Sequence, residues 1–153
     1  MLERSDVEKI KKTAKEFFDK TTFAVEVEAS LGEEGTVFVG VKTDEPQILI
    51  GEGGQTLLET QHLLKLILKR KIAEPFFLDL DINEYKKKKT DYLKETASSV
   101  ADEVVLSKKE KVLNPMPAYE RRIVHMELAN RTDVTTESIG EEPERRIVVR
   151  PRP

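Results

Sequence analysis

The stretch Ile50-Gly-Glu-Gly-Gly-Gln-Thr-Leu57 says more about the fold than any other part of this sequence. It has the form I-G-x-x-G-x-x-L, in which Gly51 and Gly54 bracket Glu52 and Gly53. Glycine adopts positive φ without steric cost and lets the backbone come close to another molecule. The loop lacks the spacing and the lysine of a P-loop, and no dinucleotide-binding strand–helix–strand unit surrounds it. Taken alone, the string is equally compatible with an ordinary turn between two helices.

The segments around this loop predict a small α+β unit. Ser5 and Glu8 have capping-box spacing ahead of apolar residues at helical intervals, which indicates an N-terminal helix. Two alternating segments joined through a turn at Gly32 and Gly35 indicate a β-hairpin. The expected order is a helix at about 5–20, strands at 23–28 and 36–42, a short helix or strand end at 47–50, an apolar helix ending near 71 and a strand at 76–82.

The rest of the chain predicts a second small unit. Asn83 is placed to cap a long helix over 83–107, whose buried stripe is expected to include Tyr85 and Tyr92. A proline at 117 suits the first turn of another helix. The expected elements are a short strand at 112–113, a helix from 117 to about 130, and strands at 134–139 and 145–150. The whole chain is thus predicted to be α+β, in the order αββααβ and then αβαββ.

The composition argues against most classes of enzyme. The 153 residues include no cysteine and only two histidines, which excludes disulfides, thiolate nucleophiles and cysteine-based metal sites. Asp79 and Asp81 lie at i and i+2 of a predicted strand and could bind magnesium, but such a pair is more often the solvated side of a half-buried strand. We therefore expect no enzymatic activity, no cofactor and no metal site.

The charge and hydropathy patterns bear on location and partners. No apolar run approaches the roughly eighteen residues of a membrane span, and the charged N-terminus is unlike a signal peptide. We therefore expect a cytoplasmic protein without membrane insertion. The net charge of −3 does not by itself indicate nucleic-acid binding, although binding depends on where the charge lies.

In its context, the glycine loop carries a family resemblance. Residues 1–82 resemble a type II KH domain, with the order αββααβ and the loop between two helices. The resemblance implies that Gly51-x-x-Gly54 lets the backbone approach about four nucleotides of a single strand. The middle positions, Glu52 and Gly53, depart from the basic or polar residues common in that family. An exposed carboxylate beside a phosphodiester is repelled by about 1 kcal/mol, while backbone amides at the start of the following helix still attract phosphate.

A second motif lies in the C-terminal part. Arg121-Arg-Ile-Val-His125 puts Arg121 and His125 one helical turn apart on one face, which alone is too short to carry a claim. Its surroundings, the strings 114–125 and 135–149, resemble an R-three-H domain, a small α+β module with a three-stranded sheet named for this Arg-x-x-x-His pair. We expect this domain to span 83–153, with the long helix 83–107 leading into it.

A KH domain followed directly by an R-three-H domain resembles the bacterial Jag (KhpB) family, here without the N-terminal Jag domain. The resemblance implies a protein that binds single-stranded RNA and regulates gene expression after transcription, with a second small KH protein or a second copy of the chain as a possible partner. The candidate nucleic-acid-binding residues are Gly51, Glu52, Gly53, Gly54, Arg121, Arg122, His125, Arg145 and Arg146. Two alternatives stay open: a protein–protein adaptor with little nucleic-acid binding, and a binder of single-stranded DNA.

Overall fold

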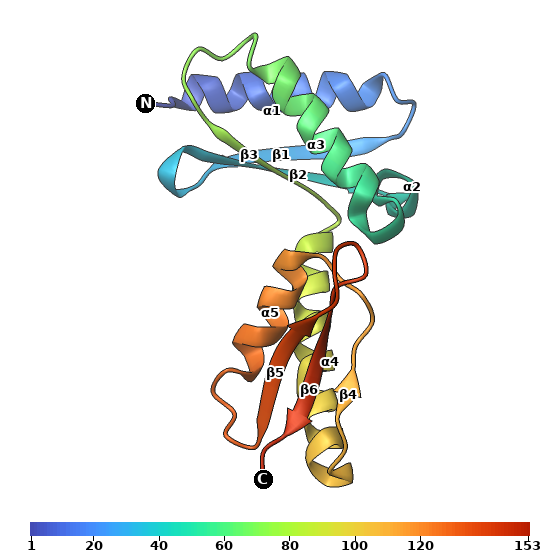
Figure 1. Ribbon diagram of the computed structural model, residues 1–153. Helices are drawn as coiled ribbons and strands as arrows, with labels where there is room; N and C mark the ends of the chain where they lie inside the picture. The colour runs from blue at the N-terminus through green and yellow to red at the C-terminus, as the bar shows by residue number, and fades with distance from the viewer. The chain divides into compact units, whose positions relative to one another are not determined.

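The computed structural model describes all 153 residues, which divide into two compact units, 1–86 and 87–153 (Figure 1). The sequence placed the boundary between residues 82 and 83. The difference arises because the first residues of the long helix make their contacts with the N-terminal unit. The Lys86 ammonium, for example, lies 2.5 Å from an oxygen of Asp79. None of the helices is both long enough and apolar enough to cross a membrane.

The N-terminal unit has a three-stranded sheet with β2 at its centre, antiparallel to β1 and parallel to β3. Helices α1 and α3 lie over the same face of this sheet (Figure 1). The elements are α1 (Arg4–Asp19), β1 (Val25–Leu31), β2 (Thr36–Thr43), α2 (Pro46–Ile50), α3 (Gln55–Leu68) and β3 (Phe77–Ile82), with short 3-10 turns η1 (Glu33–Gly35) and η2 (Glu52–Gly54). The α+β class is confirmed, and the helices and strands follow in the order predicted.

The core of this unit follows from the alternation in the strands. In β2, Val37, Val39 and Val41 point to the helices and are at most 1% exposed, while Phe38 on the other face is 45% exposed. The helices meet these valines with fully buried side chains such as Phe18 and Leu64. Burying each such side chain contributes about 1.5–3 kcal/mol, so this apolar layer holds the loop-bearing helices on the sheet.

The start of the long helix differs from the prediction. Asn83 does not cap it: its side chain instead exchanges hydrogen bonds with the backbone N–H and C=O of Thr43, at 2.9 and 2.8 Å. The capping acceptor is Asp81, whose carboxylate accepts from the backbone N–H of Lys86. At the N-terminus, likewise, the capping box is formed by Glu3 and Asp6 rather than by Ser5 and Glu8.

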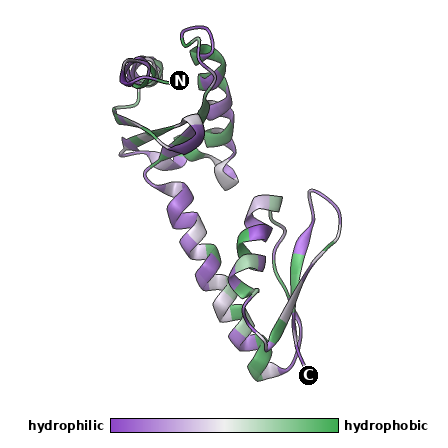
Figure 2. Ribbon diagram, turned by 90° about the vertical axis from the view of Figure 1, so that its left-hand side faces the viewer, coloured by the Kyte–Doolittle hydropathy of each residue, from purple (hydrophilic) through white to green (hydrophobic).

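The C-terminal unit packs two helices against one face of a second three-stranded sheet (Figure 2). Its elements are α4 (Tyr85–Ser107), whose first two residues belong to the N-terminal unit, then β4 (Lys111–Val112), α5 (Ala118–Leu128), β5 (Val134–Ile139) and β6 (Arg146–Pro151). The strand order is β4-β6-β5, with both pairings antiparallel.

The buried stripe of α4 is narrower than predicted. Its members include Leu93, Ala97 and Val104, which join residues of α5 and β6 in one cluster. Tyr92 is 62% exposed, so its assignment to the core is wrong. It directly precedes Leu93, and successive helical residues point about 100° apart, so Tyr92 lies to the side of the stripe that Leu93 occupies. The Lys89 ammonium lies 6.0 Å from the centre of the Tyr92 ring.

Candidate nucleic-acid interface

The glycine loop needs glycine at both of its ends. Gly51 and Gly54 have φ of +74° and +82°, in the left-handed region that other residues rarely adopt. A Cβ on Gly51 would lie 2.2 Å from the hydroxyl oxygen of Thr56, and one on Gly54 would lie 3.0 Å from the ring of Tyr85. Gly53 also has positive φ, at +61°, but a Cβ there would meet nothing within 4 Å. Gly51 is therefore required by both conformation and space, whereas at Gly54 the positive φ favours glycine and a Cβ would press on the Tyr85 ring.

The loop presents unused backbone donors to solvent. Gly51 N–H donates to the Gln47 carbonyl at 2.9 Å, and Gly54 N–H donates to the Gly51 carbonyl at 3.2 Å. The amides of Glu52 and Gly53 donate no hydrogen bond within the protein, and both residues are exposed. The Glu52 carboxylate makes no ion pair or hydrogen bond. The loop thus offers two free N–H groups to an anion and one carboxylate that opposes it.

A group of side chains that was not among the candidates selected from the sequence lies further along α3, where this helix meets β3. The side-chain oxygen of Gln61 accepts a hydrogen bond from the backbone N–H of Leu80 at 3.0 Å and one from the Lys86 ammonium at 3.1 Å. The Lys65 ammonium lies 5.3 Å from the centre of the exposed Phe77 ring. The i, i+4 spacing of Gln61 and Lys65 was readable in the sequence, but their meeting with β3 was not.

The suggested magnesium pair has other partners. Asp79 forms an ion pair with Lys86, and the Asp81 carboxylate accepts from the backbone N–H groups of Ile82 and Lys86. No cluster of three or more His, Cys, Asp or Glu side chains is placed to hold a metal ion. Asp81 also lines a hollow of about 280 Å³ on the open face of the sheet, together with Glu26, Glu28, Glu84 and a single basic residue, Lys42. This acidic hollow would repel a polyanion.

Arg121 is far more enclosed than a surface phosphate clamp. It lies in the first turn of α5 and is 8% exposed. Its Nε–H donates to the Met116 carbonyl at 3.2 Å, and its Nη2 group forms an ion pair with Glu142 from the loop between β5 and β6. As a candidate nucleic-acid-binding residue, Arg121 could donate a bidentate fork to a phosphate. In the folded protein a carboxylate already occupies part of that fork.

His125 lies one turn further along α5 and rests on β5. Its Nδ1 is 2.7 Å from the Thr136 hydroxyl, and its Nε2 is 2.9 Å from the Ser138 hydroxyl. Partial burial, and secondarily the nearby charge of Arg121, lower the pKa of His125 below its ordinary value. The imidazole is therefore neutral at pH 7 and carries one N–H, and either hydroxyl can serve as its donor or acceptor.

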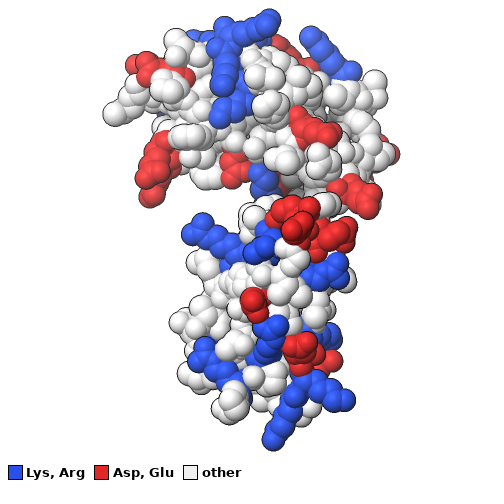
Figure 3. Space-filling model, in the orientation of Figure 1, with Lys and Arg blue, Asp and Glu red and all other residues white.

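The other candidate arginines differ in how free they are. Arg122 is exposed and makes no hydrogen bond or ion pair. Arg145 donates to the Gly140 carbonyl at 2.9 Å, and Arg146 donates to the backbone and the carboxylate of Glu144. Both therefore hold their own loop. On the face of this unit seen in Figure 3, acidic and basic side chains are interspersed.

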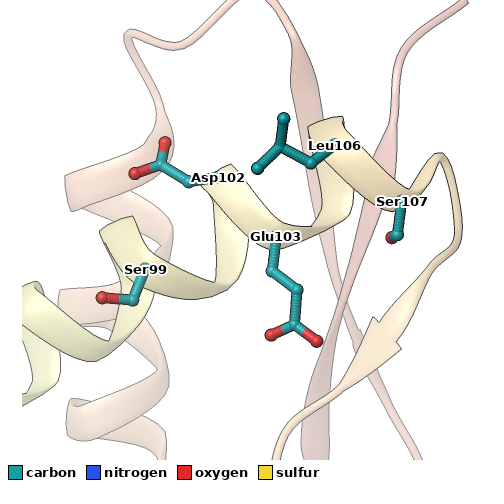
Figure 4. A pocket seen from close by; sticks show the side chains of 5 residues that line it. All are labelled: Ser99, Asp102, Glu103, Leu106 and Ser107. Atoms are coloured by element: carbon teal, nitrogen blue, oxygen red, sulfur yellow. The ribbon is translucent and has the colours of Figure 1, made fainter.

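A second hollow, of about 620 Å³, lies along α4 and is lined by Ser99, Asp102, Glu103, Leu106 and Ser107 (Figure 4). All of its lining side chains come from one helix. Its two carboxylates are already paired, Asp102 with Arg131 and Glu103 with Lys111. The hollow therefore offers neither free charge nor enclosing walls to a ligand.

Comparisons with known proteins bear on the C-terminal unit first. The R-three-H domain family matches residues 91–151, a span that contains both Arg121 and His125. The protein is also similar to curated proteins named RNA-binding protein KhpB. The one from Clostridium symbiosum is 35% identical over 86% of this chain and 60% of its own length. The chain is thus similar to the proteins of the KhpB family. The predicted resemblance to that family is thereby confirmed.

Other members of the KhpB family give a consistent picture. The relative from Lactiplantibacillus plantarum is 37% identical over 70% of this chain and 33% of its own length. The relative from Bacillus subtilis is 33% identical over 74% of this chain and 56% of its own length. The chain thus spans between 33% and 60% of the length of these KhpB proteins. The R-three-H match begins after the glycine loop, which lies in the N-terminal unit.

Proposed function

We propose that this chain binds single-stranded RNA, acts after transcription and catalyses no reaction. The observation that carries the proposal is the exposed glycine loop, whose two middle amides have no partner within the protein. The names of the relatives, each an RNA-binding protein, point the same way. In this proposal residues 1–82 work as a KH domain and residues 83–153 as an R-three-H domain.

The two units would contribute differently to binding. In the N-terminal unit, the amides of Glu52 and Gly53 would bind a phosphate, and the edge of β3 beside α3 would face the bases. In the C-terminal unit, Arg122 offers an unpaired guanidinium. Arg121 and His125, one turn apart on α5, would exchange some of their present protein partners for phosphate oxygens. Arg145, at the end of the β5–β6 loop, and Arg146, at the start of β6, would add positive charge. Most of the affinity would then come from phosphate contacts.

A second candidate function is protein–protein association through α3. Leu58, Leu63 and Leu66 on this helix are 47–60% exposed, although each is large and apolar. Clusters of exposed apolar side chains on a helix favour pairing with another surface. The occupant would be a second small KH protein or a second copy of this chain. The acidic hollow on the open face of the sheet also favours this adaptor role over nucleic-acid binding on that face.

Fluorescence anisotropy would separate these functions. The complete chain is titrated against a labelled random-sequence RNA, the matched single-stranded DNA and a duplex of the same length, at low and moderate salt. The proposal predicts binding to the single strands that weakens as salt rises, with RNA ahead of DNA. An adaptor would give no anisotropy change in any of these titrations and would elute as an oligomer in sizing chromatography.

A further inference from the structure

We infer that Glu142 competes with RNA for Arg121, and that it thereby sets the affinity of the phosphate subsite on α5. This inference rests on the proposed function and adds to it a residue that the Arg-x-x-x-His motif does not contain. Glu142 lies 21 residues beyond Arg121 in the chain, and only the folding of the β5–β6 loop brings the two together.

The contact resembles the one a phosphate would make. A guanidinium donates two parallel N–H groups to a carboxylate in the same way as to a phosphate. Nη2 of Arg121 donates to an oxygen of Glu142, and the Nε–H of Arg121 is taken by the Met116 carbonyl. An arriving phosphate oxygen would therefore meet a guanidinium whose donors on two sides are already in use.

The difference in burial decides which partner is displaced. The Arg121 side chain is 9% exposed and lies in a helix, whereas the Glu142 side chain is 57% exposed and lies in a loop. Turning Arg121 away would also break its bond to the Met116 carbonyl and leave a charge enclosed without a partner. Displacing Glu142 only returns a carboxylate to water. The phosphate would accordingly take the place of Glu142 while Arg121 stays still.

The same loop supplies a matched control. Glu141 carries the same charge as Glu142 and adjoins it in the sequence, but it is exposed and makes no hydrogen bond or ion pair. Glu144 is less suitable because its carboxylate pairs with Arg146. Comparing Glu142→Gln with Glu141→Gln therefore separates the specific contact from the general effect of removing one negative charge.

The test is an anisotropy titration of a labelled single-stranded RNA with the complete chain and its variants. Glu142→Gln keeps the shape and one hydrogen-bond acceptor but loses the charge, so RNA affinity should rise about two- to fivefold, the range of a partly exposed ion pair. Glu141→Gln should change affinity much less. Glu142→Asp, which keeps the charge but shortens the reach, should also raise affinity. In an Arg121→Ala background, Glu142→Gln should bring no gain.

Five results would overturn the inference. An equal gain in RNA affinity from Glu141→Gln would mean that the change in net charge explains the gain. A gain from Glu142→Gln that persists in the Arg121→Ala background would mean that Glu142 does not compete for Arg121. An unchanged affinity in Glu142→Gln would mean that the phosphate does not use this edge. A weakened affinity, in a variant with the melting temperature of the wild type, would make Glu142 a positioning residue for Arg121. Failure of the wild type and of Glu142→Gln alike to bind RNA would overturn the proposed function as well.

Discussion

Replacing Gly54 with alanine should damage the glycine loop more than the same change at Gly53. Both residues have positive φ, +82° and +61°, so alanine at either position carries the strain of the left-handed region, about 1–2 kcal/mol. The two positions differ in their surroundings. A Cβ at position 54 would lie 3.0 Å from Cε1 of Tyr85 and 3.4 Å from its hydroxyl, whereas a Cβ at position 53 meets open space.

The expected magnitude follows from this difference. Gly53→Ala should lower the free energy of unfolding by about 1–2 kcal/mol, from backbone strain alone. Gly54→Ala should cost about 1–3 kcal/mol more, because the methyl group overpacks against a ring held by the core of the N-terminal unit. In a Tyr85→Ala background, which has its own cost from lost packing, Gly54→Ala should show only the backbone strain and not the excess, since the two side chains then no longer collide.

Urea unfolding followed by circular dichroism would measure these differences, by comparing the urea midpoint of each variant with that of the wild type. Because the chain has two units, the transition assigned to residues 1–86 should move and that of residues 87–153 should stay. Equal destabilisation by the two alanines, or an excess that persists without Tyr85, would refute the argument that the Tyr85 ring restricts position 54 to glycine.

Three further predictions concern nucleic-acid binding. Glu52→Lys should tighten RNA binding by about 1–2 kcal/mol at low salt, because a repulsion becomes an attraction at the loop. The control Glu127→Lys makes the same charge change at another exposed position and should tighten binding less. Equal gains in anisotropy titrations would count against the loop as a contact. RNA binding should strengthen as the pH falls from 8 to 6, because a bound phosphate raises the depressed pKa of His125 and the complex takes up a proton. Folding stability should change in the opposite sense, because the pKa of His125 is lower in the folded chain than in the unfolded chain. The stability present above about pH 6.5 is therefore lost as the pH falls towards the folded pKa. A His125→Gln variant whose binding keeps the full pH dependence would assign the proton to another group. Arg122→Ala should weaken binding to RNA of every sequence and reduce the slope of log affinity against log salt by about 1. Lys109→Ala should leave that slope nearly unchanged. The reverse result would mean that the phosphate contact does not lie on α5.

The order of the helices and strands was readable from the sequence because hydrophobic periodicity is a local property. Alternation in β2 and β3 and the helical spacing in α1 and α3 each report which side of an element is buried, whatever lies against it. The errors fell where one residue had two suitable roles. Asn83 could cap a helix or bind Thr43, and Tyr92 could pack or face solvent. Such choices depend on neighbours that are distant in the chain.

The candidate site divides in the same way. The four-residue motif Gly51-x-x-Gly54 and the i, i+4 pair of Arg121 and His125 are visible in the sequence, because each lies within one loop or about one helical turn. Their surroundings are not visible, because they come from segments far apart: Tyr85 against Gly54, Gln61 against β3, and Glu142 against Arg121. Local spacing therefore revealed which groups could bind a phosphate. Packing between distant segments set how free each group is to do so, because partners, burial and pKa depend on what folding brings within a few ångströms.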